Sequence, residues 1–452
     1  MLLKAQWVLP ISKKPIEDGA VVVEGSKIKA VGKYKRLLGK FPDEEVVDFG
    51  KAIILPGFVD LHTHLEYSIF RGLLDDLSYA DWKIQLTKKS GALRKGDWEL
   101  SAYIGALESL QSGITTIADI TGSGASLRAA KDAGLRGLIY YEVADMDHTK
   151  VPEIIAEAEK TIARWADKVS GTNLTIGLAP HSPYTVSPPL YKKASEWARR
   201  NKLKICTHLA GSKAEYDFVK FGSGVLPNEY WDLVGWGDIL WQPTGVSPVK
   251  YLEEWGVFDG GEVLAVHCVQ VNEADIDILK KYNVAVAHCP RCNAKLGMGI
   301  APLPGFAQRN LKVGLGTDSP ASNNTMDIFD EMRIGVLLQR GIKGSFDFTA
   351  EDFVRMATLG GAEAINMEHE VGSLDPGKQA DIAVVDMSHS HQTPAREPYS
   401  ALVYTANQEN VMLTMVAGKI LYRDGVYATL DEQAILKKSE PIRKRLKLER
   451  EG

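Results

Sequence analysis

Several side chains that can bind a metal ion stand directly after short apolar segments of this sequence. His62 and His64 follow the first of these segments, His208 follows a later one, and His267 and Asp318 follow two more. Imidazole nitrogens and a carboxylate suit zinc or another first-row divalent ion, and they leave a coordination position for a water molecule. This donor set is therefore typical of a catalytic metal site, in which the ion activates water.

The spacing of His62 and His64 supports their sharing one ion. Side chains alternate along an extended strand, so two residues separated by one other project to the same side. A lone histidine after a strand is more often a hydrogen-bonded structural residue. For His288 both interpretations stay open, because its imidazole could brace the turn at residues 289–293. For the five side chains together, coincidence at matching positions is a poor explanation.

The apolar segments recur through the middle of the chain, and helical patterns follow them. Continuous apolar segments indicate strands covered on both faces, as in parallel sheets flanked by helices. A doubly wound sheet and a closed (β/α)₈ barrel both fit this pattern, and the number of strands and the length favour the barrel. Polar residues at the carboxyl ends of barrel strands point into one active-site mouth. The eight expected strands lie at residues 58–60, 115–118, 138–141, 175–178, 204–206, 263–266, 284–287 and 313–315.

The two ends of the chain read as short strands separated by glycines, which is typical of a small antiparallel sheet. An N-terminal sheet too short to close a core of its own gains by pairing with the C-terminal one. We therefore expect a small β-sandwich domain formed by residues 1–55 and 372–452, and an α/β barrel domain at residues 56–371. The strands expected in the small domain lie at residues 20–25, 28–32, 45–48, 380–386, 411–416 and 419–422.

The composition restricts the classes of partner. The 452 residues include 53 basic and 58 acidic side chains, and the formal net charge of −5 argues against coating of nucleic acid. No segment approaches the roughly 18 apolar residues of a membrane helix, and no apolar leader precedes a cleavage site. Four cysteines are too few for a disulfide scaffold. We expect a cytoplasmic enzyme that acts on a small molecule, with neither nucleic acid nor membrane as partner.

Three further features each have a simple alternative. Cys289 and Cys292 form one C-x-x-C. This pattern is typical of half a zinc site or of a redox pair, and the simpler alternative is two small buried residues on a turn. The tryptophan-bearing stretch between the fifth and sixth expected strands is longer than a tight loop. It forms a lid over a planar ligand or packs a homo-oligomer interface. The charged tail at residues 437–450 is most simply a solvated helix.

Ordered motifs extend over nearly the whole chain, from about Val22 to about Tyr422. They are PGFVDLHTHL at 56–65, APHSPY at 179–184, THLA at 207–210, HCP at 288–290, GTDSPASN at 316–323 and GKQADI at 377–382. Together they resemble the amidohydrolase superfamily, and within it the branch of chlorohydrolases, triazine hydrolases and adenosine-type deaminases. Ordered multiple motifs are specific in a way that no single one of them is.

The resemblance implies a mononuclear site for a divalent ion, zinc or iron. It also implies that His267 faces the metal-bound water or the substrate, and that His181 contacts the substrate. Asp318 can accept the proton of that water while it binds the ion, so Asp318 and His267 are the expected catalytic residues. The implied metal ligands are His62, His64, His208 and Asp318.

Within the branch, residues 65–82 look most like deaminases of modified adenosines, such as methylthioadenosine/S-adenosylhomocysteine or aminodeoxyfutalosine deaminases. Other candidate positions lie in or next to the motifs quoted above. The residues expected to contact substrate are Glu66, Arg71, Trp82, His181, Gly211, Cys292 and Ser322.

Two of these positions depart from the pattern of the branch. Its deaminases usually carry H-x-x-E after the fifth strand, but Gly211 stands in place of the glutamate, and Cys292 stands where serine is usual. The glutamate normally shuttles protons to the ring nitrogen and to departing ammonia, which is worth roughly 10² to 10⁴ in rate. Three explanations compete: Glu215 takes over the role from one helical turn away, the activity is reduced or redirected, or His267 or Asp318 performs the whole proton transfer.

We therefore expect a metal-dependent hydrolytic deaminase that releases ammonia from an adenosine-like or other nitrogen heterocycle. One alternative is a metal-dependent hydrolase of an activated C–Cl, ester or amide bond, because such leaving groups depart without a proton. Another, of a different class, is a catalytically weak barrel that only binds a ligand.

Overall fold

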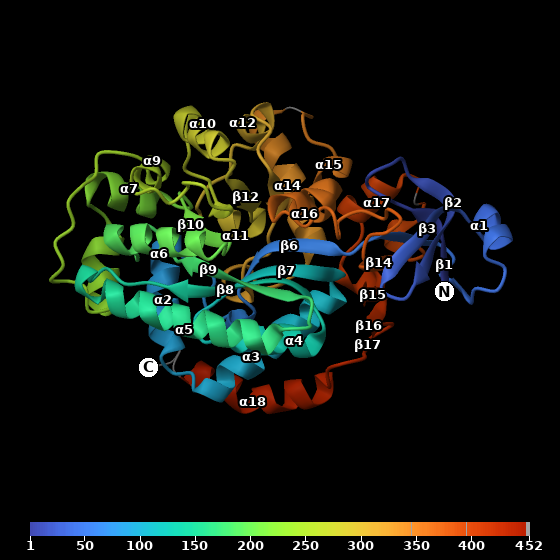
Figure 1. Cartoon of the computed structure of the whole chain (residues 1–452), viewed down its shortest axis with the longest axis horizontal. Helices are drawn as coiled ribbons and strands as arrows, with labels where there is room; N and C mark the ends of the chain where they lie inside the picture. Colours follow the sequence, from blue (N-terminus) through green and yellow to red (C-terminus); the bar gives the residue numbers. More distant parts are fainter. Residues whose placement is uncertain (345, 395, 449–452) are drawn as a thin grey trace.

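Eight parallel strands follow one another around a barrel in the computed structural model, which describes residues 1–344, 346–394 and 396–448. The order of the strands in the sheet is their order in the sequence. All residues of most of these strands are buried, because the barrel interior covers one face and helices cover the other (Figure 1). The barrel strands are β6 (Phe58–Thr63), β7 (Ile114–Thr121), β8 (Arg136–Val143), β9 (Leu174–Pro180), β10 (Ile205–Leu209), β11 (Val263–His267), β12 (Ala285–His288) and β13 (Val313–Leu315).

The first and last barrel strands meet beside two of the predicted metal ligands. The backbone N–H of Asp318 donates to the carbonyl of His62 at 2.7 Å, and Thr63 and Asp318 form a parallel bridge. Asp60 strengthens this junction, since its buried carboxylate accepts from the Thr317 N–H at 2.9 Å and hydroxyl at 2.6 Å. Closure of the barrel therefore also brings His62 and Asp318 together.

Helices surround the barrel, and a short 3-10 helix, η1 (Leu65–Phe70), follows the His62-Thr63-His64 segment directly. Among the described residues, no helix has both the length and the hydropathy needed to cross a membrane. The longer helices around the barrel are α2 (Tyr79–Ser90), α3 (Lys95–Gln111), α4 (Ala125–Ala133), α5 (Val151–Val169), α6 (Pro188–Arg200), α7 (Lys213–Phe221), α9 (Pro248–Glu254), α10 (Glu273–Lys281) and α14 (Ile328–Lys343). Shorter ones are α11 (Pro290–Lys295), α12 (Leu303–Gln308), α13 (Pro320–Asn323), α15 (Ala350–Arg355) and α16 (Gly361–Ala364).

A separate nine-stranded sheet contains strands from both ends of the chain and lies on the right of Figure 1. The two ends join where β5 and β14 pair antiparallel, with Ile54 opposite Val384. The prediction of a barrel with a small β domain built from both termini is confirmed. The strands of this sheet are β1 (Leu2–Val8), β2 (Ile16–Glu24), β3 (Lys27–Lys33), β4 (Val46–Asp48), β5 (Ala52–Pro56), β14 (Ile382–Asp386), β15 (Val411–Val416), β16 (Lys419–Arg423) and β17 (Val426–Tyr427).

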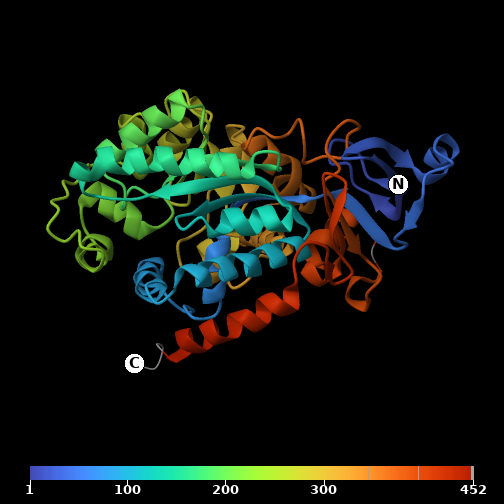
Figure 2. The same ribbon diagram turned by 60° about the horizontal axis from the view of Figure 1, so that its bottom comes forward.

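The last helix, α18 (Glu432–Leu448), leaves the small sheet and lies along α3 of the barrel (Figures 1 and 2). Ile442 and Leu446 are buried there, and Arg445 forms an ion pair with Asp97. The sequence predicted a solvated helix at residues 437–450, and the structure instead buries one side of it. The residues 449–452 of the predicted small domain lie outside the described part of the chain.

Candidate active site

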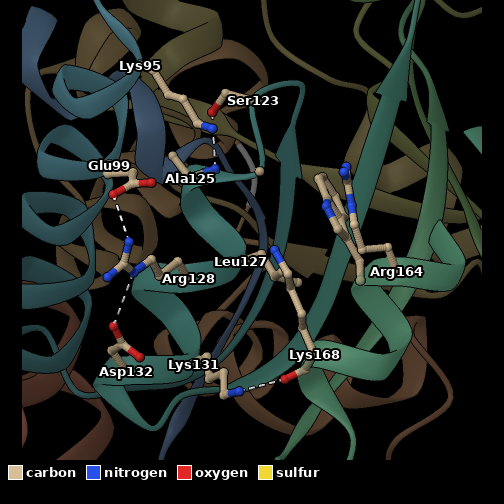
Figure 3. A pocket seen from close by; sticks show the side chains of 12 residues that line it. Lys95, Glu99, Ser123, Ala125, Leu127, Arg128, Lys131, Asp132, Arg164 and Lys168 are labelled. Carbon is tan, nitrogen blue, oxygen red and sulfur yellow. Dashed lines mark hydrogen bonds and ion pairs between the residues drawn. The ribbon is translucent and has the colours of Figure 1, made fainter. Parts of the chain in front are cut away.

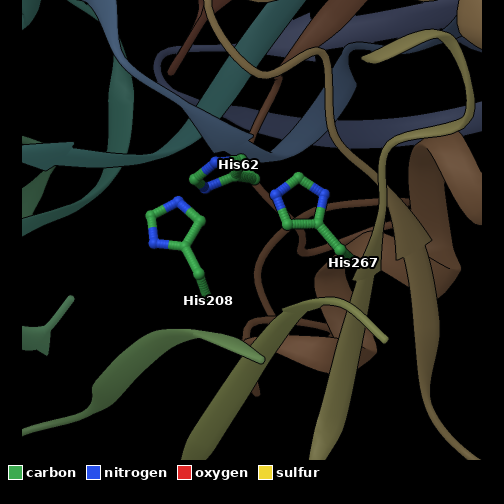
Figure 4. Close-up of side chains that lie close together, drawn as sticks. All are labelled: His62, His208 and His267. Carbon is green, nitrogen blue, oxygen red and sulfur yellow. The ribbon is translucent and has the colours of Figure 1, made fainter. Parts of the chain in front are cut away.

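The five predicted donor side chains converge at the carboxyl end of the barrel. Figure 4 shows His62, His208 and His267 extending from their strands toward a common point. Ligand atoms of these three residues all lie within 4.8 Å of one another, and so do those of His62, His64 and Asp318. His62 Nε2 lies 3.5 Å from Asp318 Oδ1, and His64 Nε2 lies 3.4 Å from His208 Nε2. Residues from four strand ends thus form one donor set.

Hydrogen bonds fix the tautomers of two of these imidazoles. His64 Nδ1 lies 3.0 Å from the Ile120 carbonyl oxygen, and His208 Nδ1 lies 2.9 Å from the His181 carbonyl oxygen. A carbonyl oxygen only accepts, so both rings donate from Nδ1 and carry a lone pair on Nε2. Two lone pairs that face each other at 3.4 Å repel unless a cation lies between them. Such backbone partners are the usual second layer of a metal site.

His62 provides an independent test of whether a metal ion fits. Both of its ring nitrogens are buried, and neither has a hydrogen-bond partner within the described chain. An unpaired buried polar atom is rare, because it loses the hydrogen bonds that water would supply. A cation bound by His62, His64, His208 and Asp318 removes this deficit, so the residues present fit one divalent ion.

The electrostatics favour the metal-binding forms of these groups. Burial lowers the pKa of His64 to about 3 and that of His267 to about 4, and it holds the pKa of His208 well below the usual value. Burial alone raises the pKa of Asp318, but the imidazoles of His62, His64 and His267 around it hold this pKa well below its usual range. Neutral imidazoles and a carboxylate are the forms that bind a cation.

The backbone is strained at the same strand ends. Ala210, His267, Cys268 and Asp318 have φ angles of 48°, 77°, 45° and 58°, which lie in the left-handed region. Residues other than glycine seldom adopt this region, and such strain gathers at functional sites. At His267 the strained backbone accompanies a fixed ring, since its Nδ1 lies 2.9 Å from Asn293 Oδ1. The ring therefore donates from Nδ1 and keeps Nε2 free.

A cavity of about 40 Å³ lies in front of the donor set. Three of the residues predicted to contact substrate line it, namely His181, Trp82 and Cys292. The indole N–H of Trp82 donates to the Ala321 carbonyl at 2.9 Å, which fixes the ring. Burial raises the pKa of the Cys292 thiol, and the charge of Asp318 raises it further. The Ser322 hydroxyl donates to the Ser319 carbonyl at 2.9 Å, so it supports the cavity wall.

Glu66 and Arg71 bind other parts of the protein. The Glu66 carboxylate accepts from the Gly122 N–H at 3.1 Å and from the Thr121 and Ser123 hydroxyls, and thereby holds the loop after β7. Arg71 forms an ion pair with Glu108 on α3. The structure gives both residues these structural contacts and does not place them in the cavity wall.

Gly211 lies just behind His267. A Cβ atom at this position would lie 3.2 Å from His267 Cδ2 and 2.9 Å from Met298 Cε, so the backbone packs closely here. Glu215 does not reach into the cavity. Its carboxylate accepts from the Ala210 N–H at 2.7 Å and the Gly211 N–H at 2.9 Å, and so it holds the turn after β10. This arrangement disfavours the first of the three explanations, in which Glu215 replaces the missing acid.

Two charged residues of the cavity wall were missed by the sequence reasoning. Lys83 follows Trp82 on α2, and Glu142 lies in β8. Burial raises the pKa of Glu142 to about 7 against the opposing charge of Lys83, and burial lowers the pKa of Lys83. A lysine next to the predicted Trp82 and a glutamate inside an apolar strand were the available signals.

For His288, the sequence left open whether its imidazole stabilises the turn at residues 289–293. Neither of its buried ring nitrogens has a hydrogen-bond partner in the described residues.

A larger cavity of about 460 Å³ lies outside the barrel, against α3, α4 and α5 (Figure 3). Its basic side chains are partly paired, since Arg128 binds Glu99 at 3.0 Å and Lys131 donates to the Lys168 carbonyl at 2.6 Å. None of its lining residues lines the catalytic cavity. This cavity therefore has no part in the metal chemistry.

Comparison with known proteins agrees with this geometry. The chain is 30% identical over 451 residues to a 5-methylthioadenosine/S-adenosylhomocysteine deaminase of Syntrophomonas wolfei, which covers 99% of both chains. It is 32% identical to a 5'-deoxyadenosine deaminase of Methanothermobacter thermautotrophicus over 94% of both chains. The structure matches that of a zinc-bound adenosine deaminase from Xanthomonas campestris with a TM-score of 0.85, at 25% identity and over 99% of this chain and 98% of that one. The amidohydrolase family model matches residues 53–421, and the chain belongs to this family.

Proposed function

We propose that this chain is a zinc-dependent hydrolytic deaminase that releases ammonia from an adenosine-like or related nitrogen heterocycle. The observation that carries the proposal is the donor set, in which the Nε2 lone pairs of His64 and His208 face each other at 3.4 Å beside Asp318. The names of the relatives, which are adenosine-type deaminases, support the substrate class.

A divalent ion held by His62, His64, His208 and Asp318 would lower the pKa of water and so provide a nucleophile near neutral pH. The residues of the chain have separate tasks. Asp318 accepts a proton from the attacking water, since its carboxylate is part of the donor set and lies 3.5 Å from His62 Nε2. His267, with Nδ1 held by Asn293, presents Nε2 to the attacked carbon. His181, held through Nδ1 by Thr185 at 2.7 Å, lies in the cavity wall as a contact for the heterocycle.

Hydrolysis of an activated C–Cl, ester or amide bond is a second candidate function, and one observation favours it. Gly211 carries no acid, and Glu215 is held by backbone amides. An amine leaves readily only when protonated, whereas chloride leaves without a proton. The same donor set would serve either reaction.

Ammonia release by the zinc-loaded protein distinguishes these functions. The panel contains 5'-deoxyadenosine, methylthioadenosine, adenosine, guanine, a chlorotriazine and an activated ester, and each is assayed for ammonia and for the alternative product. Ammonia from at least one purine, lost on chelation and restored by zinc, supports the proposal. Chloride or acid release without ammonia supports the second function. Ligand binding without any turnover indicates the binding protein.

A further inference from the structure

The catalytic cavity contains a lysine that neither the metal site nor the proposed proton transfers use. Lys83 on α2 lines the cavity, and its Nζ lies 3.3 Å from His181 Nε2 and 5.9 Å from the centre of the Tyr230 ring. When His181 donates its ring proton from Nδ1 to Thr185, its Nε2 carries a lone pair. The Lys83 ammonium can donate a hydrogen bond to this lone pair. The ammonium is thus fixed inside the cavity by a neutral partner.

No carboxylate of the described residues pairs with Lys83 within the 4.0 Å of an ion pair. Glu142, the other charged residue that the wall adds, acts on Lys83 only through its charge. A cation away from bulk water is stabilised mainly by an anion at contact distance, and here the protein does not supply one. A ligand in the cavity can supply it.

Gly211 leaves one negative charge fewer beside the same cavity. It does not line the cavity itself, but it packs against His267, which does. In the H-x-x-E pattern a carboxylate stands at this position. The positive charges at the cavity are then Lys83 and the divalent ion expected in the donor set, and the negative charges are Asp318 and Glu142. The lysine in the cavity wall and the missing carboxylate act in the same direction, because both make the site more favourable for a negatively charged ligand.

The position of Lys83 indicates which part of the ligand it meets. His181 contacts both groups: its Nε2 lies 3.3 Å from Lys83 Nζ, and its ring centre is 4.8 Å from that of His208. Lys83 lines the same cavity as the donor set without being one of the clustered donors. A heterocycle whose reacting carbon faces the ion site would turn another edge toward Lys83. The cavity of about 40 Å³ requires side chains to move when a ring enters, and the flexible lysine stem permits this.

We propose that Lys83 is a specificity-determining residue that selects heterocyclic ligands with a carboxylate away from the leaving group. The inference rests on the proposed function, because it assumes that the reacting carbon faces the metal site. It adds a substrate class, anionic heterocycles, that the deaminase activity by itself does not require.

Matched ligands that differ in charge and hardly in shape test the inference. The first pair is 6-aminopurine-2-carboxylate and its 2-carboxamide, and the second is adenosine 5'-carboxylate and its 5'-carboxamide. Dissociation constants and ammonia release are measured for the zinc-loaded wild type, Lys83→Met and Lys83→Arg. Lys88→Met, an exposed change on the same helix, is the control.

In the wild type and Lys88→Met, we expect the carboxylate of at least one pair to bind about tenfold more tightly than its carboxamide, since only the carboxylate adds a charge–charge attraction to the hydrogen bond from the ammonium. Lys83→Met should abolish this preference while carboxamide binding changes less than about twofold, and Lys83→Arg should retain part of it.

The inference is overturned by any of three results: equal binding within both pairs, failure of both carboxylates to bind, or a preference that survives Lys83→Met. If the protein releases ammonia from the carboxamides but binds carboxylates and carboxamides equally, the inference is wrong and the deaminase function is retained. If a preference for the carboxylate depends on Lys83 but no ammonia is released, only the proposed function is wrong.

Discussion

The imidazole of His62 is the residue on which the metal assignment depends most directly. It is buried, and its two ring nitrogens have no hydrogen-bond partner among the described residues, yet His64, His208 and Asp318 surround it. An unpaired buried polar atom costs about 1–3 kcal/mol, and at His62 the surrounding donors offer a cation as the compensating partner. The cation provides the missing interaction.

Replacing this imidazole should remove metal and activity together. We expect His62→Ala to retain less than about a tenth of the zinc of the wild type after dialysis, with a matching loss of turnover, since one of the few protein ligands of the ion is lost. Metal content by mass spectrometry and ammonia release measure the two effects. His369→Ala, an exposed histidine, is the control. Full turnover by a metal-retaining His62→Ala protein would refute the ligand assignment.

Restoring the acid at position 211 tests why this chain lacks it. If proton transfer limits the reaction, Gly211→Glu should raise ammonia release at least about tenfold. The new Cβ would lie 2.9 Å from Met298 Cε, so the gain requires this flexible methyl group to move. Gly211→Gln, of equal size but without an acid, is the matched control. A gain shared by both variants, or none in Gly211→Glu when Met298→Ala provides space, would show that the missing acid does not limit the rate.

At the scale of elements, the turn after β10 depends on a buried carboxylate. Glu215, at the start of α7, accepts from the Ala210 and Gly211 amides and so connects the end of β10 to the helix. Burial raises the pKa of Glu215 to about 7, against the lowering effect of these amides. The residue that the sequence offered as a substitute catalyst is thus better explained as a support for the backbone around His208.

This pKa predicts a pH dependence of stability. The folded pKa of about 7 exceeds the ordinary 4.5, so the folded state binds more protons than the unfolded state between these values. The free energy of unfolding should therefore fall as pH rises from about 4.5 to 7, by up to roughly 3 kcal/mol from this residue. Urea unfolding at pH 5 and 7 should show a smaller decline for Glu215→Gln than for the wild type. Parallel declines in the two proteins would contradict the assignment.

The elements were largely predictable, for a physical reason. Barrel strands covered on both faces need continuous apolar segments, and all eight expected segments overlap strands of the barrel. Their polar ends were predictable too, because the carboxyl ends of parallel strands open into one mouth. The place of Lys83 next to Trp82 was a weak signal, since a lysine on a charged helix looks solvated until the packing of α2 over the barrel is known. The buried side of α18 was missed for the same reason.

At the scale of the whole molecule, a buried ion pair joins the barrel to the small sheet. Arg136, at the start of β8, donates from Nε to Asp381 Oδ2 at 2.7 Å and from Nη2 to Asp381 Oδ1 at 3.2 Å. Asp381 precedes β14 and also accepts from the Ala417 N–H at 2.7 Å. The GKQADI motif of the sequence therefore has a structural explanation, because its aspartate connects the C-terminal strands of the small sheet to the barrel.

Breaking one side of this pair should destabilise the whole molecule. Both side chains are nearly inaccessible, with exposed fractions of 4% and 1%, and a partner lost from a buried pair costs about 3–5 kcal/mol because the remaining charge stays buried. Arg136 keeps only the exposed Glu370, at 3.4 Å, when Asp381 is replaced. We expect Asp381→Leu to lower the free energy of unfolding by this amount in urea titrations, and the double change with Arg136→Met to recover most of it. Glu99→Ala, which breaks the exposed pair with Arg128, should cost less than about 1 kcal/mol. If Asp381→Leu costs no more than Glu99→Ala, the pair does not hold the barrel and the sheet together. If the double variant is as unstable as Asp381→Leu, the loss comes from packing around residue 381 and the unpaired arginine is not its cause.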